Sequence, residues 1–423
     1  MIKSKLVFKT PSDAHYFFGY YDKPQLSKDG SKLLALKVGF IDRVPDKNDI
    51  AIIGYFDINK NEKFVEVSTT KSFNWQQGCM LQWVGPEFNN TIIFNDYLNG
   101  KFVSIILELD SNKKTVYNKP IYSMHPNGKL AITIDFERHH WCRRGYSYDG
   151  DFDASKNKKI VDGDAIWLID FEKNLSKKII LLQDIINKNS LSNMHNATHY
   201  LEHLMFNPTG AKFCFLHRWK IADGGIYARL YSSNIDGTEV SLLSDSGRMS
   251  HFAWKDDEYL LAYGGIENKI NKLRKYKNVL KYVIKPLLPI YHMIVNDNSR
   301  ISKMITGDSY LLLNIESKKI RRVASSISSE DGHPSFSKYG KKDIFITDTY
   351  PDPDEGSVAK LIAFDLSTNE FSVLNKLNSI PEYDNSPIRC DLHPRWSYYG
   401  EYVSIDTMND GARGCYLYEV SDE

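Results

Sequence analysis

The chain has 423 residues, 54 basic and 53 acidic side chains, and an apolar fraction of 42%. These values are typical of a globular protein with a large core, and they disfavour disordered and membrane-spanning chains. The near-zero net charge gives no overall field that would attract DNA or RNA, so nucleic acid is not an expected partner.

The first ten residues contain no apolar segment of the kind found in secretory signals, which predicts a cytoplasmic protein. Five cysteines are scattered along the chain, and no two of them occur in the Cys-x-x-Cys spacing. This spacing predicts neither a disulfide framework nor a structural zinc site. We expect the cysteines to be reduced core residues.

One pattern recurs along the whole chain: a short strand, a polar turn and a strongly apolar strand. The turns end near Gly30, Gly85, Gly128, Gly210, Asp257, Gly340 and Gly400. Apolar second strands follow each turn, and third strands are predicted at 51–57, 103–108, 166–170, 229–232, 311–316, 361–365 and 415–419. Seven such units without intervening helical periods predict an all-β, seven-bladed β-propeller with long loops, formed by residues 1–423 as one domain.

A basic insertion interrupts this pattern at about residues 265–305. Residues 267–285 are rich in lysine and place apolar side chains three or four positions apart, which predicts an amphipathic helix. Such a helix packs on its own blade, or it lies on an anionic membrane surface through residues 267–290. The second interpretation would make the protein peripheral at the inner membrane.

Histidines recur at one register of the repeat. Counting seven residues back from each turn glycine, or from the counterpart of that glycine in the fifth unit, gives Lys23, Gly78, Ile121, His203, His251, His333 and His393. The first strand of each blade lines the central channel, so equivalent positions form a ring at one height. Four imidazoles on adjacent blades predict a site for one divalent metal ion. The alternative is that each histidine only satisfies backbone groups.

The second strand of each blade returns to the same mouth of the channel, and basic and aromatic residues follow several of these strands. They are Arg43, Arg138, His140, Arg143, His217, Arg218 and Trp219. Guanidinium groups pair with carboxylates and aromatic rings stack on sugar faces, so this rim predicts an acidic oligosaccharide as ligand. Salt bridges between loops are the alternative use of these arginines.

Four segments resemble the oligogalacturonate lyases, which are seven-bladed propellers. They are residues 203–208 with 215–219, residues 250–254, residues 331–336 and residues 391–396. The resemblance implies cleavage of uronic-acid oligomers by β-elimination around a manganese-type metal. It also implies that His217 is the catalytic base and His251 a metal ligand. In the lyases a closely spaced pair of histidines binds the metal. The matching segment of this chain, residues 331–333, offers only one histidine, His333, with Asp331 two residues before it.

Residues 19–23 and 74–78 are also similar to segments of propellers encoded with bacterial surface-polysaccharide genes. The sequence therefore predicts a metal-dependent lyase in which the four ring histidines hold the metal, Arg218 pairs with the substrate carboxylate and His217 takes the proton. The alternative is a non-catalytic glycan-binding or scaffold propeller in polysaccharide biosynthesis.

Overall fold

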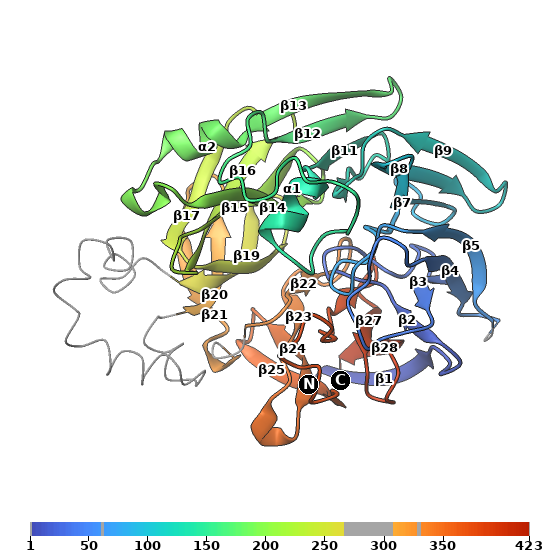
Figure 1. Ribbon diagram of the computed structural model, residues 1–423. Helices are drawn as coiled ribbons and strands as arrows, with labels where there is room; N and C mark the ends of the chain where they lie inside the picture. Colours follow the sequence, from blue (N-terminus) through green and yellow to red (C-terminus); the bar gives the residue numbers. More distant parts are fainter. Residues whose placement is uncertain (1, 61–62, 266–307, 328–330, 423) are drawn as a thin grey trace.

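The computed structural model describes residues 2–60, 63–265, 308–327 and 331–422. Its strands form seven antiparallel sheets of four strands each, which stand around a central axis as the blades of a β-propeller (Figure 1). The predicted fold class is confirmed. The predicted helix and membrane contact of the basic insertion lie outside the described residues.

The first four blades are formed in chain order. They contain β2 (His15–Phe17), β3 (Lys32–Val38), β4 (Ala51–Asp57) and β5 (Val65–Thr70); β6 (Gln82–Trp83), β7 (Thr91–Leu98), β8 (Lys101–Glu108) and β9 (Lys113–Tyr117); β10 (Ser123–Met124), β11 (Leu130–Thr133), β12 (Ala165–Asp170) and β13 (Leu175–Leu181); β14 (Thr198–Phe206), β15 (Lys212–Lys220), β16 (Ile226–Asn234) and β17 (Ser241–Gly247).

The last three blades follow the same order until the final strand. They contain β18 (Met249–Trp254), β19 (Tyr259–Gly265), β20 (Asp308–Asn314) and β21 (Ile320–Val323); β22 (Ser335–Phe336), β23 (Ile344–Asp348), β24 (Val358–Asp365) and β25 (Glu370–Asn378); β26 (Arg395–Trp396), β27 (Tyr402–Thr407), β28 (Gly414–Asp422) and β1 (Ile2–Lys9). Every predicted second and third strand overlaps an observed one.

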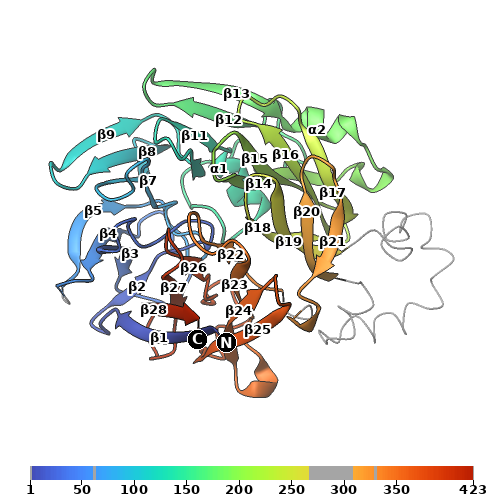
Figure 2. The ribbon, with the colours of Figure 1, turned by 180° about the vertical axis from the view of Figure 1, so that it is seen from behind.

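The two ends of the chain close the ring of blades. Strand β1 pairs antiparallel with β28, from Ile2 opposite Asp422 to Lys9 opposite Tyr416. The termini consequently lie side by side, as Figures 1 and 2 both show. Because the outer strand of the seventh blade comes from the N-terminus, ladder hydrogen bonds join the first residues of the fold to the last ones.

Few helices accompany the sheets. Helix α1 (Phe136–Cys142) and helix α2 (Leu182–Lys188) follow strands of the third blade, and single 3-10 turns occur at η1 (Ser192–Met194), η3 (Ser325–Ile327) and η4 (Pro353–Glu355). None of the helices in the described ranges is long and apolar enough to cross a membrane. All five cysteines are unpaired, and four of them are buried.

Residues 18–23, which follow β2, form a plug in the central channel. The rings of Tyr20 and Tyr21 are buried and contact histidines of the fourth to seventh blades, although both tyrosines belong to the first blade. Contacts with blades on the far side of the ring are possible only for a segment that reaches across the axis. The channel plug therefore forms the floor on which the ring histidines pack.

Hydrogen bonds to the seventh blade fix the backbone of the plug. The backbone N–H groups of Phe18 and Gly19 donate to the Asp406 carboxylate. The Gly19 carbonyl accepts from Nδ1 of His393 at 2.8 Å and from the Arg395 guanidinium at 2.5 Å. Arg395 also forms a fully buried ion pair with Asp406, with 3.0 Å between Nη2 and Oδ2. The Gly19 carbonyl, the Arg395 guanidinium and the Asp406 carboxylate all have partners in this contact, as burial requires.

Glycine is the residue that fits position 19. Its φ of +128° lies in the region that other residues rarely adopt. A Cβ atom there would stand 2.6 Å from the carbonyl carbon of Gln77 and 2.7 Å from the nitrogen of Gly78. The plug thus passes directly against the backbone of the second blade, at a distance that no side chain allows.

We expect Gly19→Ala to lower the free energy of unfolding by about 3 kcal/mol or more, since it adds backbone overlap to conformational strain. Gly224→Ala is the matched control, because Gly224 also has a positive φ, +89°, but open space around it. The control should cost only about 1–2 kcal/mol. Urea denaturation measures both variants, and equal losses would contradict the close approach at Gly19.

Candidate functional site

The structure brings the four ring histidines together above the plug. They are His203, His251, His333 and His393, all buried. The ring centroids of His251 and His333 are 4.1 Å apart, and those of His333 and His393 are 4.3 Å apart. His203 and His393 have φ values of +53° and +45°. Non-glycine residues in the left-handed region are uncommon and concentrate at functional sites.

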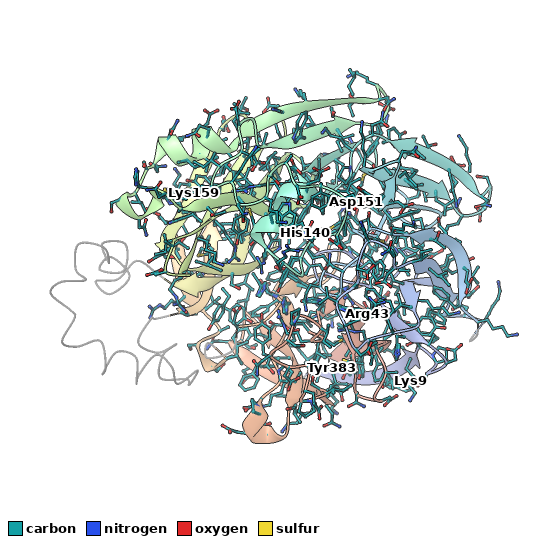
Figure 3. All side chains as sticks on the ribbon, viewed as in Figure 1. Lys9, Arg43, His140, Asp151, Lys159 and Tyr383 are labelled. Carbon is teal, nitrogen blue, oxygen red and sulfur yellow. The ribbon has the colours of Figure 1, made fainter. Side chains whose placement is uncertain are left out.

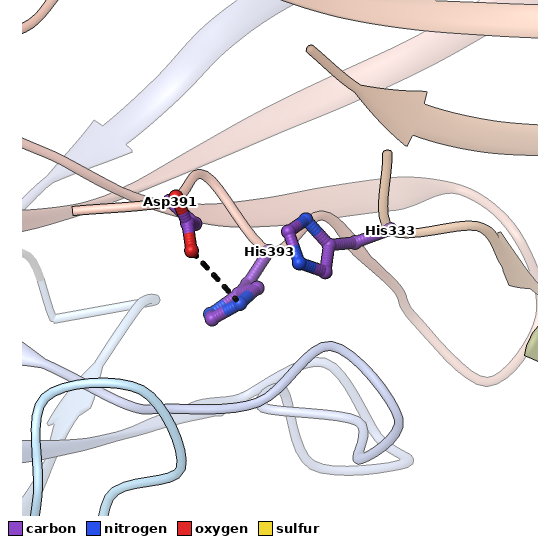
Figure 4. A group of neighbouring side chains, drawn as sticks. All are labelled: His333, Asp391 and His393. Atoms are coloured by element: carbon purple, nitrogen blue, oxygen red, sulfur yellow. Dashed lines mark ion pairs between the residues drawn. The ribbon is translucent and has the colours of Figure 1, made fainter. Parts of the chain in front are cut away.

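Two of these histidines and an aspartate form a donor group, defined here as His333, Asp391 and His393 (Figure 4). One nitrogen or oxygen atom from each side chain lies within 4.8 Å of the others. Nε2 of His393 is buried without a hydrogen-bond partner in the described part of the chain, and it stands 3.9 Å from Oδ2 of Asp391. Imidazole and carboxylate donors suit zinc, manganese and related divalent ions. The residues present therefore fit such an ion.

Asp348 orients both histidines of the donor group. Its carboxylate lies 2.9 Å from Nδ1 of His333 and accepts the backbone N–H groups of His333 and His393. Nδ1 of His393 in turn lies 2.8 Å from the Gly19 carbonyl. In each imidazole Nδ1 is engaged, which leaves Nε2 as the nitrogen for a ligand. Metal-binding histidines are commonly held in this way by a carboxylate or a carbonyl group.

The protonation states follow from burial and from these partners. Burial, together with neighbouring imidazoles, lowers the pKa of His393 far below its ordinary value and also lowers the pKa of His251. Burial alone would lower the pKa of His333 as well, but the Asp348 carboxylate outweighs it and raises that pKa. Neutral imidazole is the form that binds a metal. His393 and His251 are in that form at neutral pH.

The other two ring histidines have different partners. Nδ1 of His251 lies 3.2 Å from the Asp331 carboxylate, and its ring packs against His333. Nε2 of His203 lies 3.1 Å from the Tyr21 hydroxyl, and its ring stacks on Phe252 at 4.2 Å. Of the four predicted metal ligands, two lie in the donor group and His251 borders it. His203 faces the plug instead.

We expect the purified protein to retain one divalent metal ion after reconstitution with manganese, zinc or nickel. His333→Ala should weaken binding by more than about 100-fold, and Asp348→Asn by about 10- to 100-fold, because changes outside the ligand set cost less. His195→Ala, an exposed histidine, is the control and should bind as wild type does. Elemental analysis after dialysis decides. Folded wild-type protein that retains none of the three metals would show that the histidines are structural.

His217 does not reach the mouth of the channel, so its predicted position was wrong. The side chain is fully buried, and its Nε2 lies 3.0 Å from Nδ1 of His199. Nε2 of His199 is bound to the Met194 carbonyl, so the two imidazoles form one buried chain. Burial and His199 lower the pKa of His217 far below its ordinary value. A substrate cannot approach a side chain in this position.

Trp219 shares the orientation of His217. It is fully buried and stacks on Tyr227, with ring centroids 5.4 Å apart. Alternate residues of β15 point to the same face, and Phe213 and Phe215 place that face in the core beside the third blade. Trp219 is therefore a packing residue and not a stacking platform for a sugar, contrary to its predicted role.

Arg218 points to the other face of β15 and lies near the mouth. There it forms an ion pair with Glu202, and Arg143 pairs with the same carboxylate. Glu202 is buried, and although burial raises its pKa, the two arginines hold that pKa far below its ordinary value. One carboxylate thus faces two guanidinium groups. Two positive charges therefore meet one negative charge at Glu202, and an anion can bind to the guanidinium charge that is not neutralised.

The remaining predicted rim residues have other partners. Arg138 is buried and donates to the backbone carbonyls of Ser155, Lys158, Lys159 and His199, so it orders the loop after α1. Arg43 forms a bidentate pair with Asp49. His140 is bonded to Arg144, and burial lowers its pKa to about 4. Figure 3 shows His140 and Arg43 at separate places in the molecule.

Two residues at the mouth were not predicted, Tyr146 and Arg389, whereas Tyr350 follows β23, where the end of a second strand predicts a rim residue. Arg389 donates from Nε to the Asp391 carboxylate at 3.0 Å and from Nη2 to the Tyr146 hydroxyl at 2.9 Å. Its guanidinium stands 5.7 Å from the centre of the Tyr350 ring. Both unpredicted residues lie in loops, where the repeat gives no register. Tyr146 and Arg389 fall in residues 136–200 and 366–390, where the spacing between repeat units exceeds what a blade needs, and this surplus was the only sequence signal for them.

Comparison with protein-family models and with curated proteins finds no match. Among solved structures, the oligogalacturonate lyase of Vibrio parahaemolyticus is 11% identical, with a TM-score of 0.61 over 99% of this chain and 96% of that chain. The propeller domain of the Trilobed protease from Pyrococcus furiosus is 11% identical, with a TM-score of 0.47 over 96% and 97%.

TolB from Acinetobacter baumannii is 12% identical, with a TM-score of 0.40 over 93% of this chain and 82% of that chain. The chain shares its fold with the lyase. At these identities the likeness is one of fold alone, since propellers carry many unrelated functions.

Proposed function

We propose that this protein is a metal-dependent lyase that cleaves uronate-containing oligosaccharides by β-elimination. The observation that carries the proposal is the buried donor group of His333, Asp391 and His393, bordered by the guanidinium group of Arg389. A buried divalent-ion site beside a cationic rim suits a substrate that must bind through a carboxylate.

The reaction explains why both features are needed. Removal of the proton next to a carboxylate places negative charge on that carboxylate, so cations fixed around it lower the barrier. A bound divalent metal supplies Lewis-acid stabilisation of the same group. Arg389 supplies a further guanidinium group at the mouth. Arg143 and Arg218 share the single carboxylate of Glu202, so one of their two positive charges is not neutralised by it. This charge also selects acidic over neutral sugars.

Aromatic side chains complete the proposed sugar site. Tyr146 and Tyr350 are half-buried residues at the mouth, and both lie beside Arg389. Such rings present apolar faces to the C–H faces of a sugar while their hydroxyls remain polar. The fold shared with oligogalacturonate lyase and the four similar sequence segments support the same substrate class.

We expect the metal-loaded protein to cleave at least one member of a panel of uronate oligosaccharides into products that contain a new carbon–carbon double bond. The combined product mass should equal the substrate mass, because no water is added. His393→Ala should reduce turnover by about 100-fold or more, since it removes a donor for the metal, whereas His195→Ala should have no effect. Ultraviolet absorbance and mass spectrometry are the measurements.

Two results would contradict the proposal. Products heavier by one water would indicate hydrolysis. Tight binding of an acidic oligosaccharide without any product across the panel would favour the non-catalytic glycan-binding propeller.

A further inference from the structure

We infer that Tyr146 is the base that removes the proton next to the substrate carboxylate. This inference rests on the proposed function and assigns the step that His217 cannot perform from its buried position. Tyr146 lies in the loop after α1 and is half-buried at the mouth. Its hydroxyl accepts a hydrogen bond from Nη2 of Arg389, and the Arg143 guanidinium stands 3.8 Å from the centre of its ring.

Two guanidinium groups make Tyr146 suited to carry negative charge. Arg389 donates directly to the phenol oxygen, and a hydrogen bond of this kind is stronger to a phenolate than to a phenol. Arg143 lies over the ring face, where a cation stabilises the added charge of the aromatic system. Arginine stays protonated at every pH at which the protein is folded, so both charges are permanent.

Arg389 also fixes Tyr146 relative to the metal-binding residues. The same guanidinium that donates to the Tyr146 hydroxyl donates from Nε to both oxygens of Asp391, at 3.0 Å. One planar side chain therefore spans from the phenol oxygen to the donor group. A substrate carboxylate bound at this place would bring the hydrogen on its neighbouring carbon next to the Tyr146 oxygen, which is the arrangement that general-base catalysis requires.

The other candidate side chains at the mouth are less suited. Burial and the nearby carboxylates of Asp331 and Asp391 raise the pKa of Tyr350 far above its ordinary value. Tyr20 belongs to the plug, and burial raises its pKa in the same way. The Nε2 atom of His203 is bound to the Tyr21 hydroxyl. Tyr146 combines partial exposure with two cationic neighbours.

The proposed step is balanced without any further reagent. The Tyr146 phenolate oxygen takes the proton from the carbon next to the carboxylate, and the electron pair of that C–H bond becomes the new carbon–carbon double bond. The bond between the adjacent carbon and the bridging oxygen breaks, and that oxygen takes a proton from water. The Tyr146 phenol then returns its proton to water.

Tyr146→Phe tests the inference, with Tyr399→Phe as the control, because Tyr399 is an exposed tyrosine outside the donor group and the rim. We expect the first variant to lose about 100- to 10,000-fold in turnover, the range for loss of a general base, and to lose exchange of the substrate proton with deuterated water. Metal content and oligosaccharide affinity should stay at wild-type values. Tyr399→Phe should leave turnover at the wild-type value, because its exposed ring lies outside the proposed site.

A second variant keeps the ring and the hydroxyl and changes only the acidity of the phenol. Tyr146→3-fluorotyrosine should remain active, and the pH below which turnover falls should move down, because a fluorinated phenol gives up its proton at lower pH. The charged and titratable groups that face Tyr146 are Arg143, Arg389, Tyr20 and Tyr350, and none of them is altered.

The two failures are distinguishable. Wild-type protein without elimination activity on the whole panel would overturn the proposed function. An active wild type with Tyr146→Phe within about tenfold of it, or an unmoved pH profile with fluorotyrosine, would overturn the role of Tyr146 alone.

Discussion

The contact between the channel plug and the seventh blade is the constraint on which the site depends. Gly19 has a positive φ and passes against the backbone of the second blade, and its carbonyl accepts from both His393 and Arg395. The buried pair of Arg395 and Asp406 then fixes the peptide on both sides. Tyr20 and Tyr21 are consequently held across the axis, where the ring histidines pack on them. This floor fixes the height of the imidazoles, and Asp348 fixes the orientation of the two in the donor group.

The buried charges around the mouth are arranged as unequal pairs. Asp348 serves His333 and two backbone N–H groups, and Asp391 faces Arg389. One Glu202 carboxylate meets two arginines. A buried ion pair costs desolvation energy that its own attraction only partly offsets, so it is weak evidence for stability. At Glu202 alone there is one guanidinium group more than the carboxylate can neutralise, and an anionic ligand bound there would complete the pairing.

The fold by itself does not select a chemistry, because propellers of this topology carry many functions. What distinguishes this molecule is the combination of a donor group, a fixed tyrosine and a cationic rim at one end of the channel. The long loop after α1 supplies Arg143 and Tyr146, and the segment before β26 supplies Arg389 and Asp391. Loops on a rigid scaffold are a common place for binding and catalytic residues.

The sequence by itself determined the propeller and the ring of histidines. Turn spacing sets the register of each blade, and the symmetry of the fold converts equal register into equal height, so His251, His333 and His393 could be placed together without a structure. The face to which a side chain points was decided only by the tertiary structure. Both faces of β15 are buried between blades, so the pattern of polarity could not show that His217 turns into the core while Arg218 turns to the mouth. Tyr146 and Arg389 lie in loops, and their meeting depends on how two segments distant in sequence fold back over the channel.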